Sequence, residues 1–84
     1  MPPVLIYSTP GCQACRISAS QFDAKGVTYE MIKLHEQPER ADDIASLGYS
    51  QAPVVVVPND PAYGDMAGQH WSGLRPDLIG ALAA

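Results

Sequence analysis

Positive charge is scarce in this sequence, and long hydrophobic runs are missing altogether. The 84 residues include only five Lys and Arg, spread singly, against nine Asp and Glu, so the formal net charge is −4. A nucleic-acid partner is not expected, because neutralising phosphates requires clustered cations. No apolar run approaches the roughly 18 residues that a membrane-spanning helix needs, so no membrane association is expected.

The N-terminus also lacks the features of a secretory signal. Met1-Pro2-Pro3 provides neither a basic start nor a long apolar stretch. We therefore expect a cytoplasmic protein, and in that reducing compartment a pair of cysteines is more often catalytic or metal-binding than structural. The sequence contains no repeat, linker or low-complexity segment, which indicates that residues 1–84 form one domain.

The length of the chain limits where an active site can lie. A chain of this size buries roughly 60–65% of the surface that its unfolded form exposes. The composition, 46% hydrophobic and 17% charged, is typical of a folded domain rather than a disordered tail. Such a chain supports one thin core, so we expect function at the surface, at a helix end or in a shallow groove.

Hydrophobic periodicity and turn residues predict an α/β fold. Short apolar or alternating runs predict strands, and helical spacing bounded by Pro or Gly predicts helices. The predicted strands are Val4–Tyr7, Val27–Leu34, Val54–Val57 and a short one around Gln69–Trp71, and the predicted helices are Cys12–Lys25, Pro38–Gly48 and one that begins at Arg75-Pro76-Asp77. The order is β-α-β-α-β-β-α. We expect a four-stranded mixed sheet with helices on its faces, its first two strands parallel and its last two antiparallel.

Two segments carry more specific expectations. In the second helix, four apolar side chains are expected to be buried, namely Ala41, Ile44, Ala45 and Leu47. Residues 58–68 are dense in Pro, Gly, Asn and Asp, which predicts a mobile surface loop. Because the preceding strand runs away from Pro53, we expect this loop at the end of the sheet opposite the cysteines.

The two cysteines stand three residues apart, as Cys12-Gln13-Ala14-Cys15, where the first strand meets the first helix. At a helix N-terminus, unpaired backbone N–H groups and the positive end of the helix dipole stabilise a thiolate, which is the nucleophile of disulfide exchange. Cys15 lies on the same helical face and within bridging reach of Cys12. We expect an exposed Cys12 to attack a substrate disulfide and a buried Cys15 to resolve the mixed disulfide.

Two other uses of the cysteine pair, in a structural disulfide or in a metal site, are less favoured than redox catalysis. A structural disulfide would close only a very small loop, in a reducing compartment. A zinc site needs about four ligands, and only His35 and His70 could join the cysteines, without paired ligand spacing. Redox catalysis is therefore the main interpretation, with no metal and no cofactor expected beyond the redox-active disulfide itself.

Pro53 admits two interpretations. A proline is tolerated at the start of a strand, where its missing N–H costs least. Alternatively, a cis Ala52–Pro53 bond would expose the Ala52 backbone beside Cys12, where it could pair with an extended substrate segment.

Trp71 and Arg75 also each leave two roles open. Trp71 is expected either in the core or at a rim beside Cys12, where it would contact partners. Arg75 is expected to form a surface ion pair with Asp77 or Asp65, or else to contact substrate.

Three motifs together span nearly the whole length of the chain. They are Cys12-Gln13-Ala14-Cys15 after an apolar strand, Ala52-Pro53-Val54-Val55, and Trp71-Ser72-Gly73-Leu74-Arg75-Pro76-Asp77 near the end. In these motifs the chain resembles the NrdH-redoxin family. A Cys-x-x-Cys pair alone indicates only a thioredoxin-like protein. The third motif is the specific part of the resemblance.

This resemblance implies a glutaredoxin-sized thioredoxin fold with a cis proline at Pro53. It implies a hydrogen donor for the large subunit of class Ib ribonucleotide reductase, re-reduced by thioredoxin reductase and NADPH, and we expect it to act as a monomer. The residues expected to face a substrate or partner are Gln13, Ala14, Ala52, Pro53, Trp71, Ser72, Gly73 and Arg75.

Two alternative functions remain at this stage. A glutathione-dependent glutaredoxin is one, but Thr9 stands where such proteins often carry a Lys, Gln13-Ala14 replaces Pro-Tyr, and Leu74-Arg75-Pro76 replaces an acid-bearing segment. Without those groups the charges of glutathione would lack fixed partners. A redox-switched binding protein is the other, and the short chain, with no room for an added binding domain, argues against it.

Overall fold

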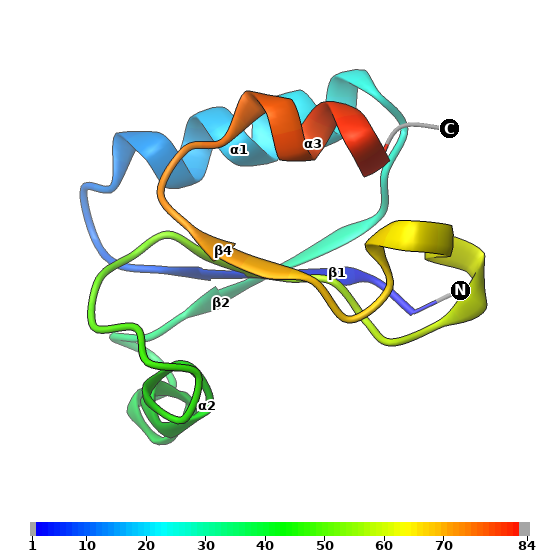
Figure 1. Ribbon diagram of the computed structural model, residues 1–84. Helices are drawn as coiled ribbons and strands as arrows, with labels where there is room; N and C mark the ends of the chain where they lie inside the picture. Colours follow the sequence, from blue (N-terminus) through cyan, green and yellow to red (C-terminus); the bar gives the residue numbers. More distant parts are fainter. Residues whose placement is uncertain (1, 83–84) are drawn as a thin grey trace.

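The structure, a computed structural model, describes residues 2–82 and has the predicted order of elements (Figure 1). The strands are β1 (Val4–Ser8), β2 (Tyr29–Lys33), β3 (Val54–Val56) and β4 (His70–Ser72), and the α-helices are α1 (Gln13–Ala24), α2 (Ala41–Ala45) and α3 (Pro76–Leu82). Two 3-10 helices, η1 (Pro38–Arg40) and η2 (Pro61–Met66), precede α2 and β4. The chain has the thioredoxin-like fold that the resemblance implies.

The four strands form one mixed sheet in the order β2-β1-β3-β4. β1 and β2 are parallel, with Ser8 opposite Lys33, whereas β3 runs antiparallel to both of its neighbours. Tyr7 is paired with Val54, so the start of β3 lies beside the end of β1. This register brings the segment before β3 to the edge of the sheet from which the chain leaves toward α1.

Helices cover the two faces of the sheet unequally. α1 and α3 lie together on one face, and the short α2 lies on the other (Figure 1). Alternate strand residues supply the two cores because successive side chains point to opposite faces. The core beneath α1 and α3 comprises Val4, Ile6, Ala19, Phe22, Val55, Val57, Trp71 and Ile79, and the core beside α2 comprises Tyr7, Ile32, Ile44 and Val54.

Helix α1 agrees with its predicted pattern. Cys15, Ala19 and Phe22 are buried, as their i, i+4, i+7 spacing predicts, together with Ser18. The helix ends before Gly26, whose φ of +72° is a conformation that side chains disfavour. Burial of a large apolar side chain such as Phe22 contributes about 1.5–3 kcal/mol, so this face fixes α1 on the sheet.

Helix α2 is much shorter than predicted. The segment from Pro38 to Gly48 begins as the 3-10 turn η1 and contains only five α-helical residues. Ile44 alone is buried in α2, and the expectation that Ala41, Ala45 and Leu47 are buried is wrong. A helix of little more than one turn can present only about one residue to the sheet, since side chains recur on a face every 3–4 positions.

Residues 58–68 lie at the surface, as predicted, and contain the 3-10 helix η2, which the prediction of a loop did not include. Asp60 accepts a hydrogen bond from the N–H of Ala62 at 2.8 Å at the start of η2. Tyr63 and Met66, three residues apart, pack against the core beneath α1 and α3, and the Tyr63 hydroxyl donates to the carbonyl of Pro2. The predicted position is confirmed, because η2 lies at the end of the sheet remote from the start of α1 (Figure 1).

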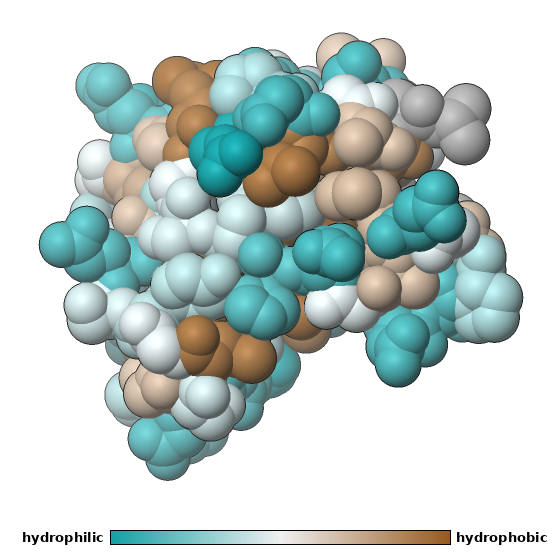
Figure 2. Space-filling view, viewed as in Figure 1, coloured by the Kyte–Doolittle hydropathy of each residue, from teal (hydrophilic) through white to brown (hydrophobic). Residues whose placement is uncertain are grey.

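The surface that faces the viewer in Figure 2 has hydrophobic residues only in separate small patches among hydrophilic and neutral ones. Among residues 2–82, the large hydrophobic side chains classed as exposed are Ile17 and Leu47. No helix in this part of the chain is long and apolar enough to cross a membrane.

Candidate active site

A tight turn after β1 delivers Cys12 to the start of α1. The N–H of Cys12 donates to the carbonyl of Thr9 at 3.3 Å, and Gly11 within the turn has a φ of +73°. That left-handed conformation suits glycine, which has no Cβ to clash with the backbone. Cys12 thereby becomes the N-cap residue of α1, with extended backbone angles, as N-cap residues typically have.

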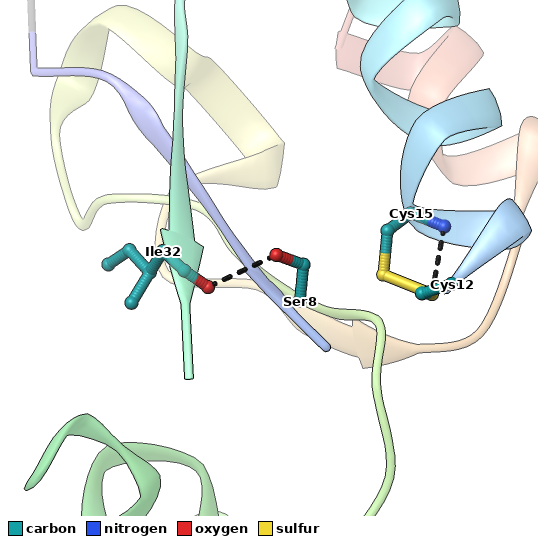
Figure 3. Close-up of a disulfide and its surroundings, with 4 residues drawn as sticks. All are labelled: Ser8, Cys12, Cys15 and Ile32. Carbon is teal, nitrogen blue, oxygen red and sulfur yellow. Dashed lines mark hydrogen bonds between the residues drawn. A yellow bond between two sulfur atoms is a disulfide. The ribbon is translucent and has the colours of Figure 1, made fainter. Parts of the chain in front are cut away.

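Cys12 and Cys15 form a disulfide, with their Cα atoms 5.3 Å apart. The backbone N–H of Cys15 points at Sγ of Cys12 at a distance of 3.1 Å (Figure 3). Cys12 is half-buried, whereas Cys15 is only 2% exposed. The predicted difference in exposure is confirmed, and Cys12 is the sulfur that a partner can reach.

Ser8 holds the two parallel strands together close to this turn. Its hydroxyl donates to the carbonyl of Ile32 at 3.4 Å (Figure 3), and its carbonyl accepts from the N–H of Leu34 at 2.9 Å. The Ser8 side chain is 6% exposed. Sequence reasoning did not identify this residue, because a serine at the end of an apolar strand is also typical of an ordinary turn.

The peptide bond between Ala52 and Pro53 is cis, which confirms the geometry that the resemblance implies. The pairing of Tyr7 with Val54 places Pro53 next to the end of β1, so Pro53 and the Cys12 turn lie at the same end of the sheet. The carbonyl of Pro53 accepts a hydrogen bond from the N–H of Gly73 at 2.9 Å. Ala52 is half-buried, and Pro53 is buried.

Trp71 occupies the core, the first of the two positions considered for it. Its side chain is 4% exposed and packs beneath α1 and α3. Its indole Nε1 is buried and has no hydrogen-bond partner among residues 2–82. The neighbouring Ser72 and Gly73 are half-buried at the end of β4, so they and not Trp71 present surface at this edge.

Arg75 forms the surface ion pair that was one of its two expected roles. Its Nε and Nη2 atoms donate to the two carboxylate oxygens of Asp77 at 3.1 and 2.9 Å. The carboxylate raises the pKa of Arg75, and the guanidinium lowers the pKa of Asp77. Of the other predicted partner-facing residues, Gln13 is exposed and Ala14 is half-buried on the first turn of α1.

A groove of about 340 Å³ opens directly beside the disulfide. Its walls come from the turn Ser8–Cys12 and from Cys15 and Arg16 at the start of α1. The remaining wall is formed by Met31 and Lys33 of β2 and by His35, which follows β2. Sequence reasoning gave Lys33 no role and His35 no catalytic role. The predicted parallel pairing of the first two strands could have identified both residues, because the carboxyl ends of two parallel strands meet at one edge of a sheet.

No group of three or more His, Cys, Asp or Glu side chains that could hold a metal ion occurs within residues 2–82. His70 instead has its Nδ1 2.8 Å from the hydroxyl of Tyr49. The arrangement of Cys12 at the helix N-terminus, with Cys15 buried behind it, can perform thiol–disulfide exchange.

Comparisons with known proteins agree with this geometry. The Glutaredoxin family profile matches residues 4–61. The glutaredoxin-like protein NrdH of Escherichia coli K12 is 33% identical over 79 residues, which cover 94% of this chain and 86% of that protein. NrdH of Lactococcus lactis IL1403 is 28% identical over 80 residues, covering 95% of this chain and 99% of that protein.

Solved structures give the same result. NrdH-redoxin from E. coli superposes with a TM-score of 0.80 at 31% identity, covering 99% of this chain and 97% of that one. A glutaredoxin from Brucella melitensis superposes with a TM-score of 0.60 at 28% identity, covering 98% of this chain and 78% of that one. The chain therefore belongs to the glutaredoxin family and, within it, to the NrdH-type glutaredoxin-like redox proteins.

Proposed function

We propose that this chain is a dithiol–disulfide electron carrier that reduces a disulfide in a partner protein. The observation that carries the proposal is the asymmetry of the cysteine pair. Cys12 is half-buried, which leaves part of it open to a partner, and it lies at a helix N-terminus, where its sulfur accepts the N–H of Cys15 at 3.1 Å. Cys15 is 2% exposed behind it, so it can reach Cys12 but not a partner.

The proposed reaction has two exchange steps. In the first, the Cys12 thiolate attacks one sulfur of the partner disulfide, forms a mixed disulfide and releases the other partner sulfur as a thiolate. In the second, Cys15 loses its proton, attacks Sγ of Cys12 and releases the second partner thiolate. Two electrons pass to the partner, which ends as a dithiol after taking up two protons, and this chain ends with the Cys12–Cys15 disulfide.

The proposed partners are thioredoxin reductase with NADPH as electron source and the class Ib ribonucleotide reductase large subunit as acceptor, in the cytoplasm. The E. coli NrdH-redoxin structure is described as that of a glutaredoxin-like protein with a thioredoxin-like activity profile, which supports this electron source. The sequence supports it too, since Thr9 offers no cation to a glutathione carboxylate.

A coupled assay tests the proposal. The purified chain is mixed with NADPH and thioredoxin reductase, then with insulin or with the oxidised ribonucleotide reductase large subunit, and NADPH consumption is followed. We expect many turnovers per molecule, none with the Cys12→Ser variant, and much slower reduction when glutathione and glutathione reductase replace thioredoxin reductase. A single turnover would instead identify a redox switch, and fast turnover with glutathione would identify a glutathione-dependent glutaredoxin.

A further inference from the structure

The charged residues of this chain are distributed unevenly around the disulfide. Of the five Lys and Arg and two His residues in the sequence, three line the groove beside Cys12, namely Arg16, Lys33 and His35. None of the nine Asp and Glu residues lines it. A chain with a net charge of −4 therefore has a basic groove next to its reactive sulfur.

The cations in the groove also have weaker ion pairs than the two arginines outside it. Arg40 and Arg75 are held by carboxylates, with Arg40 Nε 2.7 Å from Asp43 and Arg75 Nη2 2.9 Å from Asp77. Arg16 forms no ion pair within residues 2–82.

Lys33 and His35 share one carboxylate outside the groove lining. Their Nζ and Nε2 atoms lie 4.0 and 3.5 Å from Glu36, whose side chain is 61% exposed. An ion pair so exposed contributes little free energy, so Lys33 loses little when it exchanges Glu36 for a carboxylate of a partner.

The groove is continuous with the reacting atoms. Cys12 and Cys15 form part of its wall, together with the apolar Pro10 and Met31. A segment that is bonded through sulfur to Cys12 can therefore extend directly over Arg16 and Lys33. Arg75 is not part of the groove lining, and its charge is paired with Asp77.

We propose that this groove selects partner proteins whose redox-active disulfide is flanked by acidic side chains, which Arg16 and Lys33 bind. The proposal rests on the function proposed above and names the chemistry of its substrate. An acidic partner is repelled by the net negative charge of this chain as a whole. The local positive charge would therefore orient the acidic segment on Cys12, because charge complementarity sets register and association rate more than overall affinity.

Two matched disulfide peptides test the proposal. They are identical except that two Glu flank one cysteine in the first peptide and two Gln replace them in the second. Second-order rate constants for reduction by the fully reduced chain are measured by stopped flow at low salt. We expect the acidic peptide to react about tenfold faster, or about threefold per charge, as exposed pairs allow. At about 0.5 M salt the advantage should largely vanish.

Variants locate the effect. The double variant Arg16→Gln/Lys33→Gln should bring the ratio of the two rate constants close to one. Lys25→Gln, at the opposite end of α1, removes one positive charge away from the groove and should leave the ratio unchanged. The ratio cancels any change in the intrinsic reactivity of Cys12, since both peptides react with the same thiolate.

Each failure has a separate meaning. Equal rates for the two peptides, or a loss of preference in Lys25→Gln as large as in the double variant, would overturn the acidic-segment proposal and leave the proposed function intact. If oxidised glutathione gained more from Arg16 and Lys33 than the acidic peptide does, the groove would serve a tripeptide and the proposal would be wrong. If neither peptide were reduced, the proposed function itself would fail.

Discussion

The backbone N–H of Cys15 lies 3.1 Å from Sγ of Cys12, so the residue proposed to resolve the mixed disulfide also donates its main-chain N–H to the sulfur proposed to attack. The contact uses the main chain of Cys15, not its thiol. Replacing the Cys15 side chain therefore leaves the contact in place. The attacking and resolving roles can be separated by substitution for this reason.

We expect Cys15→Ser to keep the first exchange step and to lose the second. The variant should accumulate a mixed disulfide with its partner, seen by mass spectrometry or non-reducing gels, because no resolving thiol remains. Cys12→Ser should lose all activity and trap no partner. Normal multiple turnover by Cys15→Ser on a protein disulfide would contradict the assignment of roles.

The helix-capping position of Cys12 should make it reactive at lower pH than an ordinary cysteine. Alkylation of the reduced chain is measured against pH, and the Cys15→Ser variant reports Cys12 alone. We expect the midpoint to lie below about 8.5, the value of a free thiol, because helix N–H groups favour the thiolate. A midpoint at or above that value would show that the N–H contact in the disulfide form does not act on the thiolate.

The packing of η2 predicts that Tyr63 stabilises the fold without serving the active site. Tyr63→Ala removes a core contact and the hydrogen bond to Pro2, and we expect the free energy of unfolding in urea to fall by about 1–3 kcal/mol. The rate of disulfide reduction should be unchanged, since η2 lies at the far end of the sheet from Cys12. Asp65→Ala, an exposed position in the same segment, is the control and should change neither quantity.

A polar cluster that attaches α2 to the sheet predicts how stability changes in acid. Asp43 accepts hydrogen bonds from Arg40 at 2.7 Å and from the Tyr7 hydroxyl at 3.0 Å, and Arg40 lies over the Tyr7 ring, 5.8 Å from its centre. The bond from Arg40, and then that from Tyr7, lower the pKa of Asp43. A lowered pKa means that the carboxylate stabilises the fold above about pH 4, its unfolded value, and that this contribution is lost as the pH falls through the folded value.

Melting temperature measured between about pH 2 and pH 6 tests this dependence. The Asp43→Asn variant should lose less stability on acidification than the parent chain, although Asp77 beside Arg75 still contributes in both. Asp42→Asn is the matched control, since Asp42 forms no ion pair within residues 2–82, and it should behave like the parent. Equal pH profiles for all three chains would show that the cluster does not contribute.

Much of this fold could be predicted from the sequence, because most of its helices and strands are each specified by residues within that element or next to it. The run at Val4–Tyr7, the spacing of Cys15, Ala19 and Phe22, and the Gly that follows α1 each predict one element. α2 could not be predicted to its true length, because only the sheet beneath decides that Ile44 alone is buried. The packing of η2 was missed for a related reason, since turn residues reveal a break in the chain but not the core that Tyr63 and Met66 join.

The active site likewise contains residues that local sequence predicts and residues that only the topology reveals. The roles proposed for Cys12 and Cys15 follow from their spacing and from the helix that begins there. The contributions of Ser8, Lys33 and His35 depend on the parallel pairing of β1 with β2, which joins residues about 25 positions apart. Such residues require the topology to be known before their proximity to Cys12 can be recognised.

The hydrogen bond between Tyr63 and the Pro2 carbonyl has a practical consequence for anything joined to the beginning of the chain. It holds the first described residue at the pole of the molecule remote from the disulfide. A peptide tag, a fused reporter protein or a linker to a solid support attached there would leave Cys12 facing outward. The chain is therefore suited to oriented immobilisation, for instance on an electrode or a resin that retrieves its mixed-disulfide partners.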